Sequence, residues 1–475
     1  MNDSNQKTDL ATGQTDKQQT ITLIGAGLVG SLLAVLLARR GLKVELYERR
    51  SDMRKADISA GRSINLALAN RGIYPLEQAG LMDKVAPILT PMKGRMVHDL
   101  DGNENFQSYG QKEQEVIYSV SRGDLNKICL DAAEETGLVN IHFNQSCKKV
   151  NFENNQIHFM NAQTNVVTSV NFEQMIGTDG SASAVREAIH EKESSRHDIL
   201  ELGHSYKELC IPAGKNGEFQ IDKNSLHIWP RGGYMLIALP NEDASFTVTL
   251  FMPTKGEISF ESLDSKEKAF DFFETHFKDT ISLLPSLQED FFENPTGRLA
   301  TVKCEPWHYK NKALLLGDAA HAIVPFHGQG MNCGFEDAIT LAETLDKFQI
   351  ESNQKIDWKK LFKEVDNKRK ENGDAIADMA IENYITMRDS VRDEKFLLKN
   401  ALGFELEKQF PDFFCPRYSM VMFHRLAYSE AKRRGVIQEE ILSELTDNIL
   451  ELELVDFNLA EKLISKKLTQ VNLNP

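Results

Sequence analysis

The chain has 475 residues, of which 41% are hydrophobic and 26% are charged, and its formal net charge is -15. This length allows two or three domains with sizeable cores, and the composition is that of a soluble globular protein. The negative charge, with no compensating basic stretch, argues against a nucleic-acid partner. The six scattered cysteines indicate reduced thiols in an intracellular protein and no disulfide framework.

The N-terminal part of the chain begins with a polar segment, residues 1–19, which we predict to be a disordered tail because it lacks the apolar core of a signal peptide. Ile21–Ile24 is predicted to be a strand and Leu28–Arg40 a helix. The stretch Ile21–Ala38 is long and apolar enough to suggest a membrane span. Three glycines in nucleotide-binding register favour a buried strand and helix instead.

The turn between this strand and helix has the sequence Gly25-Ala26-Gly27-Leu28-Val29-Gly30. Glycines at such a turn let bare backbone approach a pyrophosphate, and the helix N-terminus favours its charge. A second strand, Lys43–Tyr47, ends at Glu48, an acid placed to accept hydroxyls of an adenine ribose. The pattern predicts a dinucleotide site. The alternative is a tight packing turn in an ordinary α/β protein.

Two further glycine segments indicate which dinucleotide binds. Gly177-Thr178-Asp179-Gly180 follows the apolar strand end Met175-Ile176 and leads into a helix over Ala184–Ile189. Gly317-Asp318 ends a predicted strand over Ala313–Leu316, where an Asp can bond the ribityl hydroxyls of a flavin. NAD alone requires only the first motif, so the three segments together predict FAD.

The segment Pro325-Phe326-His327-Gly328-Gln329-Gly330-Met331-Asn332 is predicted to open a helix from about Cys333. Backbone N–H groups at this helix N-terminus would face the carbonyl side of the flavin ring and stabilise negative charge there. His321 and His327 lie six residues apart. No acidic or cysteine ligand accompanies them at a useful spacing, so no metal site is predicted.

The spacing of the motifs predicts an α/β (α+β) fold of three parts. A Rossmann-type FAD-binding domain, formed by 20–75, 113–190 and 298–345, is interleaved with a substrate domain. The substrate domain comprises 76–112 and 191–297. It is expected to hold an antiparallel sheet, because strand-like runs at 225–229, 234–239 and 245–252 are separated by turn signals. Residues 346–475 are predicted to form a helical C-terminal region that covers the active site.

The order of the three FAD segments resembles the single-component flavoprotein aromatic hydroxylases. Five further segments are similar to the kynurenine 3-monooxygenase family within that group, and the resemblance covers about residues 20–445. These segments are Gly61-Arg62-Ser63-Ile64-Asn65-Leu66-Ala67-Leu68, Gly94-Arg95-Met96-Val97-His98, Tyr206-Lys207-Glu208-Leu209, Leu226-His227-Ile228-Trp229-Pro230 and Pro416-Arg417-Tyr418-Ser419-Met420.

The resemblance implies a set of cofactor-binding residues. These are Gly25, Gly27, Val29, Gly30, Glu48, Arg49, Arg50, Ala67, Arg122, Asp179, Asp318, Met331 and Asn332. Among them, Arg122 matches an arginine at the diphosphate or ribityl region, and Ala67 matches a small residue beside the cofactor.

The resemblance also implies a kynurenine site. Arg95 would clamp the α-carboxylate as a planar, permanently charged partner, and Tyr109, Asn383 and Tyr418 would add hydrogen bonds. The aromatic end would lie in an apolar slot, and His327 would help to orient the ring. Candidates for the slot are Leu226, Phe251, Pro325 and Phe326.

Each substrate residue also has a structural interpretation. Arg95 could form a surface or interface salt bridge, Tyr109 and Tyr418 could be core aromatics, and Asn383 could face solvent. His327 occupies a place where some relatives have an aromatic residue, which leaves the orientation of the substrate open.

The implied reaction is the NADPH- and O₂-dependent hydroxylation of L-kynurenine to 3-hydroxy-L-kynurenine through an FAD C4a-hydroperoxide, in tryptophan catabolism and NAD biosynthesis. No covalent nucleophile is expected. The expected location is the cytoplasm, since this chain lacks the hydrophobic C-terminal anchor that animal and fungal relatives can carry. The expected state is a monomer or homodimer. The alternatives are a related hydroxylase of another aminoaryl acid or phenol, a flavin-dependent halogenase, for which no W-x-W-x-I-P segment is present, and a non-catalytic FAD-binding protein.

Overall fold

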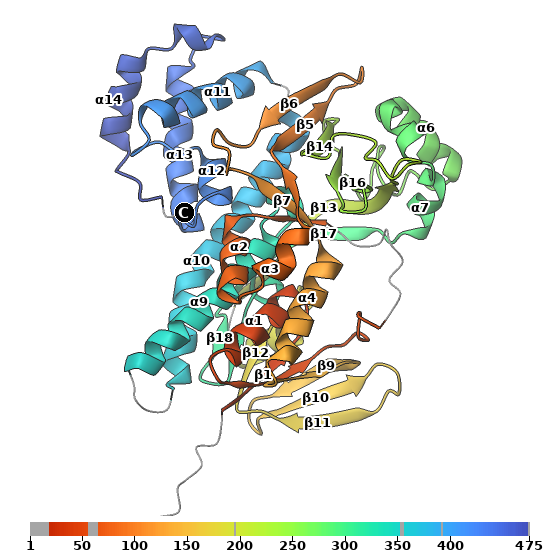
Figure 1. Cartoon of the computed structure of the whole chain (residues 1–475), viewed down its shortest axis with the longest axis vertical. Coiled ribbons are helices and arrows are strands. Elements are labelled where there is room, and N and C mark those ends of the chain that lie inside the picture. The colour runs from red at the N-terminus through yellow and green to blue at the C-terminus, as the bar shows by residue number, and fades with distance from the viewer. Residues whose placement is uncertain (1–18, 56–64, 194–195, 352–355, 391–392, 474–475) are drawn as a thin grey trace, which may run out of the picture.

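The computed structural model describes residues 19–55, 65–193, 196–351, 356–390 and 393–473. Most of the predicted tail, residues 1–18, lies outside the described residues, as do Gly61 to Ile64 of the first family segment. The chain forms a mixed α/β molecule in which two large sheets lie one above the other in Figure 1, with a group of helices beside the upper sheet.

The lower sheet in Figure 1 has six strands, and all neighbouring pairs are parallel except β18 with β19. In sheet order the strands are β18 (His308–Tyr309), β19 (Ala313–Leu315), β12 (Gln174–Gly177), β1 (Thr20–Ile24), β2 (Lys43–Tyr47) and β8 (Val139–His142). The strands predicted from the three glycine segments therefore lie side by side, with β1 between β12 and β2. Their carboxyl ends meet at one edge of the sheet, which brings the three glycine turns together.

Three helices pack together beside this sheet: α1 (Leu28–Ala38), α4 (Arg122–Glu135) and α9 (Gly330–Glu351). Every residue of α1 except Val29 is buried, which explains an apolar stretch that resembles a membrane span. The helix predicted from about Cys333 begins earlier, at Gly330. The preceding turn closes at Gly328, which takes the left-handed conformation with φ 62°, so helical geometry is possible from Gly330 onward.

Two small antiparallel sheets and four short helices are attached to this part of the molecule. The sheets consist of β3 (Asn65–Leu68), β7 (Ile117–Ser121) and β4 (Thr90–Met92), and of β9 (Gln145–Asn151), β10 (Gln156–Asn161) and β11 (Val167–Asn171). The helices are α2 (Asn70–Gln78), α3 (Met82–Val85), α5 (Ala184–Lys192) and α8 (Asp318–His321).

The upper sheet has seven strands and is antiparallel except for the parallel pair β14 and β5. In sheet order the strands are β17 (Gly297–Glu305), β13 (Arg196–Ile211), β16 (Phe246–Pro253), β15 (Met235–Pro240), β14 (Ser225–Pro230), β5 (Gly94–His98) and β6 (Glu104–Ser108). The three predicted runs correspond to β14, β15 and β16, and their antiparallel pairing is confirmed.

Strand β13 is not predicted from the sequence, because charged residues interrupt any regular alternation along it. It pairs with β16 on one side and with β17 on the other. Helices α6 (Lys266–His276) and α7 (Leu287–Glu293) also lie within the insertion 191–297. They pack against this sheet through a core that includes Trp229, Phe246 and Phe273.

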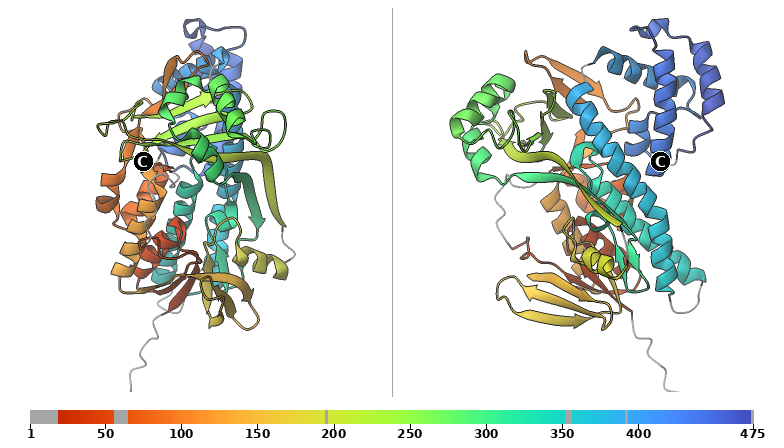
Figure 2. Two further views of the ribbon diagram at one scale, coloured as in Figure 1. Left: turned by 90° about the vertical axis from the view of Figure 1, so that its right-hand side faces the viewer. Right: turned by 180° about the vertical axis from the view of Figure 1, so that it is seen from behind.

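The C-terminal region is helical, as predicted. Its helices are α10 (Trp358–Ile385), α11 (Glu394–Gln409), α12 (Arg417–Met422), α13 (Tyr428–Leu445) and α14 (Phe457–Lys467). Helix α10 runs along the molecule from α9 to the other C-terminal helices (Figure 2). Leu402, Leu406 and Ile441 belong to a separate apolar core within this group. Among the described helices, none combines the length and apolarity needed to cross a lipid bilayer.

Candidate functional site

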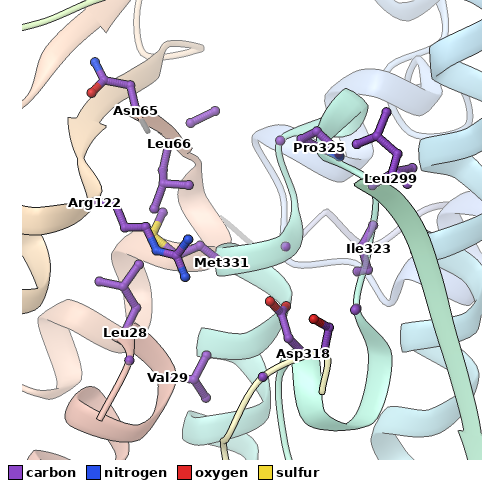
Figure 3. A pocket seen from close by; sticks show the side chains of 18 of the residues that line it. Leu28, Val29, Asn65, Leu66, Arg122, Leu299, Asp318, Ile323, Pro325 and Met331 are labelled. Carbon is purple, nitrogen blue, oxygen red and sulfur yellow. The ribbon is translucent and has the colours of Figure 1, made fainter. Parts of the chain in front are cut away.

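A cavity of about 710 Å³ extends from the carboxyl edge of the six-stranded sheet to the inner face of the seven-stranded sheet and to α12. Figure 3 shows part of its lining, with Val29 and Asp318 in the lower part of the view and Pro325 and Leu299 at the upper right. All three glycine segments contribute to its wall. All eight predicted substrate residues, together with His327, also line this cavity.

The turn after β1 forms one end of the cavity. Gly25 has φ +102° and lies so close to β12 that an added Cβ would be 2.4 Å from the Thr178 carbonyl oxygen. Gly27, in contrast, faces open space, with no atom within 4 Å of an added Cβ. Gly30 does not line the cavity, and an added Cβ there would be 1.9 Å from the Gly25 carbonyl oxygen. Gly25 and Gly30 therefore shape the turn, while Gly27 leaves room for a ligand at the N-terminus of α1.

Glu48 lies at the end of β2 on the cavity wall, beside Arg49 and Arg50. Its carboxylate accepts a hydrogen bond from the Ala26 amide at 2.9 Å, and from Arg50 Nε at 2.8 Å. Burial acts to raise the pKa of Glu48, but the hydrogen bonds and charge of Arg50 outweigh it, so the pKa is lowered. A charged carboxylate is thus held at the position where the sequence predicts ribose recognition.

Asp179 also lies on the cavity wall, but its carboxylate is engaged within the protein. It accepts hydrogen bonds from the Ser183 hydroxyl at 2.5 Å and from the Ala184 amide at 2.8 Å. These bonds satisfy backbone donors at the start of α5. The side chain therefore shapes the turn that places Gly180 on the cavity wall.

Asp318 and Arg122 contribute charged groups of opposite sign to the cavity (Figure 3). Asp318 is the first residue of α8, after Gly317 in the left-handed region, and it is exposed to the cavity. Arg122 is the first residue of α4 and lies beside Met331 of α9. Ala67 of β3 completes this part of the wall.

Asn332 lies behind the cavity wall. Its side-chain amide donates to the Ala67 and Gly328 carbonyl oxygens, at 2.8 Å each, and its Oδ1 accepts from the Ala69 amide at 3.0 Å. This fully buried residue connects β3 to the turn before α9. Its side chain fixes the wall and does not face the space inside it.

These residues fit an FAD molecule. A flavin dinucleotide presents a pyrophosphate, ribose and ribityl hydroxyls and a flat ring. The cavity offers an open helix N-terminus at Gly27, carboxylates at Glu48 and Asp318, a guanidinium at Arg122 and the N-terminus of α9. The three turns meet around one space, as the sequence predicts.

The other end of the cavity is apolar. Phe251 of β16 meets Phe326 edge to face at a centroid distance of 4.8 Å, and Phe326 stacks on Tyr384 of α10 at 3.9 Å. Leu226, Ile228 and Ile237 extend this surface along β14 and β15. The resulting slot is suited to an aromatic ring.

Arg95 of β5 enters the cavity beside two tyrosines. It forms no ion pair with an acidic side chain in the described part of the chain, and its buried Nε has no hydrogen-bond partner there. Tyr109 and Tyr418 stack at a centroid distance of 5.3 Å. Burial is the main cause that raises the pKa of Tyr109 to about 12 and the pKa of Tyr418 well above its usual value. Both phenols therefore stay protonated. The Tyr418 hydroxyl interacts with that of Tyr109, which leaves the Tyr109 proton available to an anion held by Arg95.

Asn383 and His327 border the same space. The Asn383 amide donates to the Phe326 carbonyl oxygen at 2.6 Å, which connects α10 to the 3-10 turn Pro325–His327. His327 stacks on Tyr418 at 5.5 Å, and its buried Nδ1 has no partner among the described residues. Burial lowers the pKa of His327 to about 4, so the ring is neutral near pH 7.

Comparison with known proteins agrees with this geometry. The model of an FAD binding domain matches residues 18–355. The chain is 46% identical to a kynurenine 3-monooxygenase of Myxococcus xanthus over 95% of this chain and 96% of the relative. It is 44% identical to a kynurenine 3-monooxygenase of Stenotrophomonas maltophilia over 95% of this chain and 97% of the relative. This chain belongs to the kynurenine 3-monooxygenase family.

Solved structures of more distant proteins share the fold. A 2-methyl-3-hydroxypyridine-5-carboxylic acid oxygenase superposes with a TM-score of 0.63 at 18% identity, covering 79% of this chain and 94% of that chain. A tetracycline destructase superposes with a TM-score of 0.57 at 20% identity, covering 80% of this chain and 94% of that chain. At these identities the likeness concerns the fold alone.

Some residues of the cavity are not predicted from the sequence. Tyr206 and Glu208 of β13 and Thr249 of β16 give one part of the wall a polar surface. Thr249 lies two residues before Phe251, so the alternation of a strand would have placed both on one face. Met422 of α12 lines the cavity as well, and no sequence pattern distinguishes it from a core residue.

A buried polar cluster lies behind the flavin-side wall. His321, Cys333 and Asp337 come together with ligand atoms within 4.8 Å of one another. Cysteine and acidic partners for His321 are therefore present, although the sequence spacing does not indicate them. Asp337 already accepts bonds from His321 at 2.5 Å and from Arg369 at 2.7 Å. Burial opposes protonation of His321, but the Asp337 charge outweighs it and raises its pKa well above the usual value, so two cations already neutralise the carboxylate.

Proposed function

We propose that this protein hydroxylates L-kynurenine to 3-hydroxy-L-kynurenine, with FAD bound in the cavity and NADPH and O₂ as co-substrates. The observation that carries the proposal is the position of Arg95. An arginine without an acidic partner in the described part of the chain lies beside a stacked pair of protonated phenols and lines the same cavity as an aromatic slot. This combination matches a substrate with a carboxylate at one end and an aryl ring at the other.

The carboxylate end of kynurenine would be bound by charge and hydrogen bonds. Arg95 can donate two parallel hydrogen bonds to a carboxylate. The stacked pair Tyr109 and Tyr418 would add hydrogen bonds beside Arg95, and the Asn383 side-chain oxygen can accept one from the ammonium group.

The aryl end would lie against Phe251, Phe326 and Leu226, with Pro325 beside them. Neutral His327 lines this part of the cavity and would help to orient the ring. These contacts hold the ring and exclude water from it. FAD, when bound, supplies the acceptance of a hydride and the activation of oxygen, and no side chain needs to act as a covalent nucleophile.

The remaining assignments are also proposals. Glu48, Asp318, Arg122 and Met331 are proposed to contact FAD directly, while Asp179 and Asn332 are proposed to support the wall. The domain boundaries, the preference for NADPH, the cytoplasmic location and the monomeric or dimeric state remain predictions from the sequence.

The test is NADPH consumption by the FAD-loaded protein with and without L-kynurenine, together with quantification of 3-hydroxykynurenine. We expect kynurenine to stimulate oxidation and to yield one product molecule per NADPH. Stimulated oxidation that yields only hydrogen peroxide would mean that kynurenine is an effector and that another aminoaryl acid is the substrate. Absence of any stimulation would refute the proposal.

A further inference from the structure

Gln329 is a buried residue in the turn that forms the flavin-side wall. It lies between Gly328 and Gly330, which line the cavity together with Met331, but Gln329 itself does not line it. Its Oε1 accepts a hydrogen bond from the Tyr428 hydroxyl at 2.7 Å. Its Nε2 donates to the Met422 sulfur at 3.0 Å. Both ends of the Gln329 amide are therefore held by the C-terminal region.

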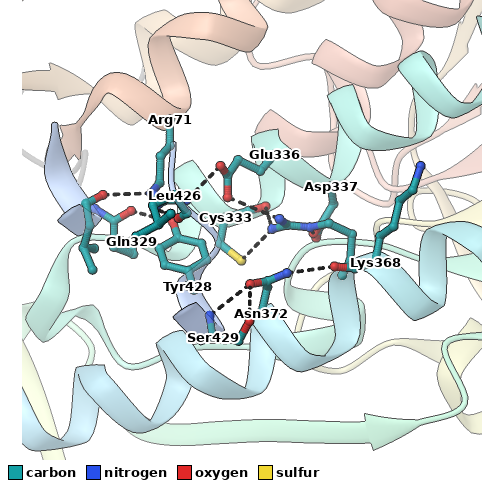
Figure 4. Close-up of polar contacts among 12 residues, drawn as sticks. Arg71, Gln329, Cys333, Glu336, Asp337, Lys368, Asn372, Leu426, Tyr428 and Ser429 are labelled. Atoms are coloured by element: carbon teal, nitrogen blue, oxygen red, sulfur yellow. Dashed lines mark hydrogen bonds and ion pairs between the residues drawn. The ribbon is translucent and has the colours of Figure 1, made fainter. Parts of the chain in front are cut away.

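Tyr428, the first residue of α13, is itself held by Arg71 (Figure 4). The Arg71 guanidinium carbon lies 3.9 Å from the centroid of the Tyr428 ring, a cation–π contact in a buried environment. Arg71 also donates to the Val421 carbonyl oxygen at 2.8 Å and to the Leu426 carbonyl oxygen, and it pairs with Glu336 of α9 at 2.9 Å.

The short segment 417–428 therefore contacts both the substrate end of the cavity and the turn on its flavin side. Tyr418 lines the substrate end, where it stacks on Tyr109 and on His327. Ten residues later, Tyr428 holds Gln329 and with it the turn beside Met331. A shift of this segment on substrate binding would be passed to the flavin-side turn through the Tyr428–Gln329 hydrogen bond.

We propose that Tyr428 and Gln329 are positioning residues that connect occupancy of the substrate end to the geometry of the flavin-side turn. The inference rests on the proposed function, because it requires FAD and kynurenine to bind in this cavity. Neither residue touches the reacting groups. Their role is to set where the backbone of residues 328–331 lies when substrate is present.

The test is the Tyr428→Phe variant, which removes the hydroxyl and keeps the ring over which Arg71 lies. Three quantities are measured: the FAD dissociation constant, the change in the visible flavin spectrum on titration with L-kynurenine, and the stimulation of NADPH oxidation by kynurenine. We expect the FAD and kynurenine affinities to change little. The stimulation should fall by about tenfold, the effect of one lost buried hydrogen bond on an equilibrium constant, and the spectral change should diminish.

A matched control is Tyr234→Phe. The Tyr234 hydroxyl and the His276 ring form a hydrogen bond at 3.0 Å where α6 packs on the seven-stranded sheet. Tyr234 does not line the cavity, and the apolar core to which it belongs contains no residue of 417–428, so the spectrum and stimulation of this variant should equal those of the wild type.

The double variant Tyr428→Phe/Gln329→Met separates positioning from folding. Replacing both partners of a buried hydrogen bond with apolar groups restores much of the stability that loss of one partner costs. If thermal stability recovers and the stimulation stays low, the inference is supported, even where Tyr428→Phe alone folds poorly. If the stimulation recovers together with stability, or if Tyr428→Phe behaves as the wild type, the inference is overturned. A wild type that kynurenine does not stimulate refutes the proposed function, and the inference falls with it.

Discussion

Arg95 illustrates how a single residue can favour an anionic ligand. Its guanidinium is always charged, and within the described part of the chain it has no acidic partner, while its neighbours Tyr109 and Tyr418 are neutral. A partly buried charge without a counter-charge is costly, and a substrate carboxylate would relieve that cost. An ion pair with Arg95 can therefore contribute to the binding free energy of a carboxylate ligand.

We expect Arg95→Ala to weaken kynurenine binding by about 100-fold, because hydrogen bonds to charged groups are stronger than neutral ones. Arg95→Lys should recover only part of this loss, since an ammonium cannot form the planar pair. The measurement is the KM for kynurenine in the NADPH oxidation assay, with the FAD dissociation constant as a control. Unchanged KM values in both variants would remove Arg95 from the substrate site.

His321 carries a different kind of prediction, about pH. Its pKa is raised in the folded protein, so protonated His321 stabilises the native state fully below its unfolded pKa of about 6.5, and this contribution is lost as pH rises through the raised pKa. We expect His321→Gln to lower the free energy of unfolding by about 3–5 kcal/mol near pH 6, the usual cost of breaking a buried pair. The difference from the wild type should shrink by pH 9, as measured by chemical denaturation. A difference that grows with pH would contradict the protonated state.

At the scale of elements, glycines only a few residues apart in the turn between β1 and α1 are needed for different reasons, one for packing and the other for ligand access. Gly30 must lack a Cβ because the Gly25 backbone occupies that place. Gly27 has room for a Cβ in the protein itself, and its φ of −73° suits any residue. Its requirement for glycine, if any, comes from the ligand.

Gly27→Ala and Gly30→Ala form a matched pair that tests this distinction. We expect Gly27→Ala to keep the melting temperature of the FAD-free protein and to bind FAD about tenfold or more weakly, since an added methyl blocks backbone approach to the pyrophosphate. Gly30→Ala should destabilise the FAD-free protein by about 1–3 kcal/mol through overpacking. Calorimetry without FAD, followed by FAD titration, checks both. Equal FAD affinity in Gly27→Ala and the wild type would show that the cofactor does not approach this turn.

At the scale of the whole molecule, the C-terminal helices complete a cavity that the two sheets leave incomplete. Tyr418 and Met422 come from α12, Asn383 comes from α10, and Met387 comes from the π-helical segment Thr386–Ser390 that follows it. Arg71 fastens this region to the FAD side by bonding carbonyl oxygens of 420–426 and Glu336. Loss of these Arg71 contacts should therefore destabilise residues 417–428, which are far from α2 in sequence.

We expect Arg71→Met to lower the free energy of unfolding by about 3–5 kcal/mol, because Glu336 then retains only Arg369 and three carbonyl groups lose their donor. Hydrogen exchange should increase most in residues 417–428. Arg433→Met, which removes an exposed ion pair on α13, is the control and should change little. An increase in hydrogen exchange that is uniform along the chain in Arg71→Met would mean that Arg71 does not hold the C-terminal region in place.

The sequence by itself determined the type of fold and the cofactor. The strands β1, β2 and β12 and the helix α1 were predictable, because apolar periodicity and glycine turns are local signals. The sequence also predicted that the three glycine segments meet around one cavity, since parallel strands align their carboxyl ends. The resemblance of five segments to a known family added the substrate residues, which the structure places along that cavity.

Only the tertiary structure decided what each side chain faces. Asn332 and Asp179 belong to the flavin segments in sequence, yet their polar atoms bond the protein's own backbone. Cys333 and Asp337 lie beside His321 because the chain reverses at the turn Pro325–His327, so that the start of α9 packs next to α8. Long-range contacts, such as those of Arg71 with residues 420–426, produce no periodic pattern in the amino-acid sequence. The physical reason is that a hydrogen bond between distant segments depends on packing, while local sequence records only which face of an element is apolar.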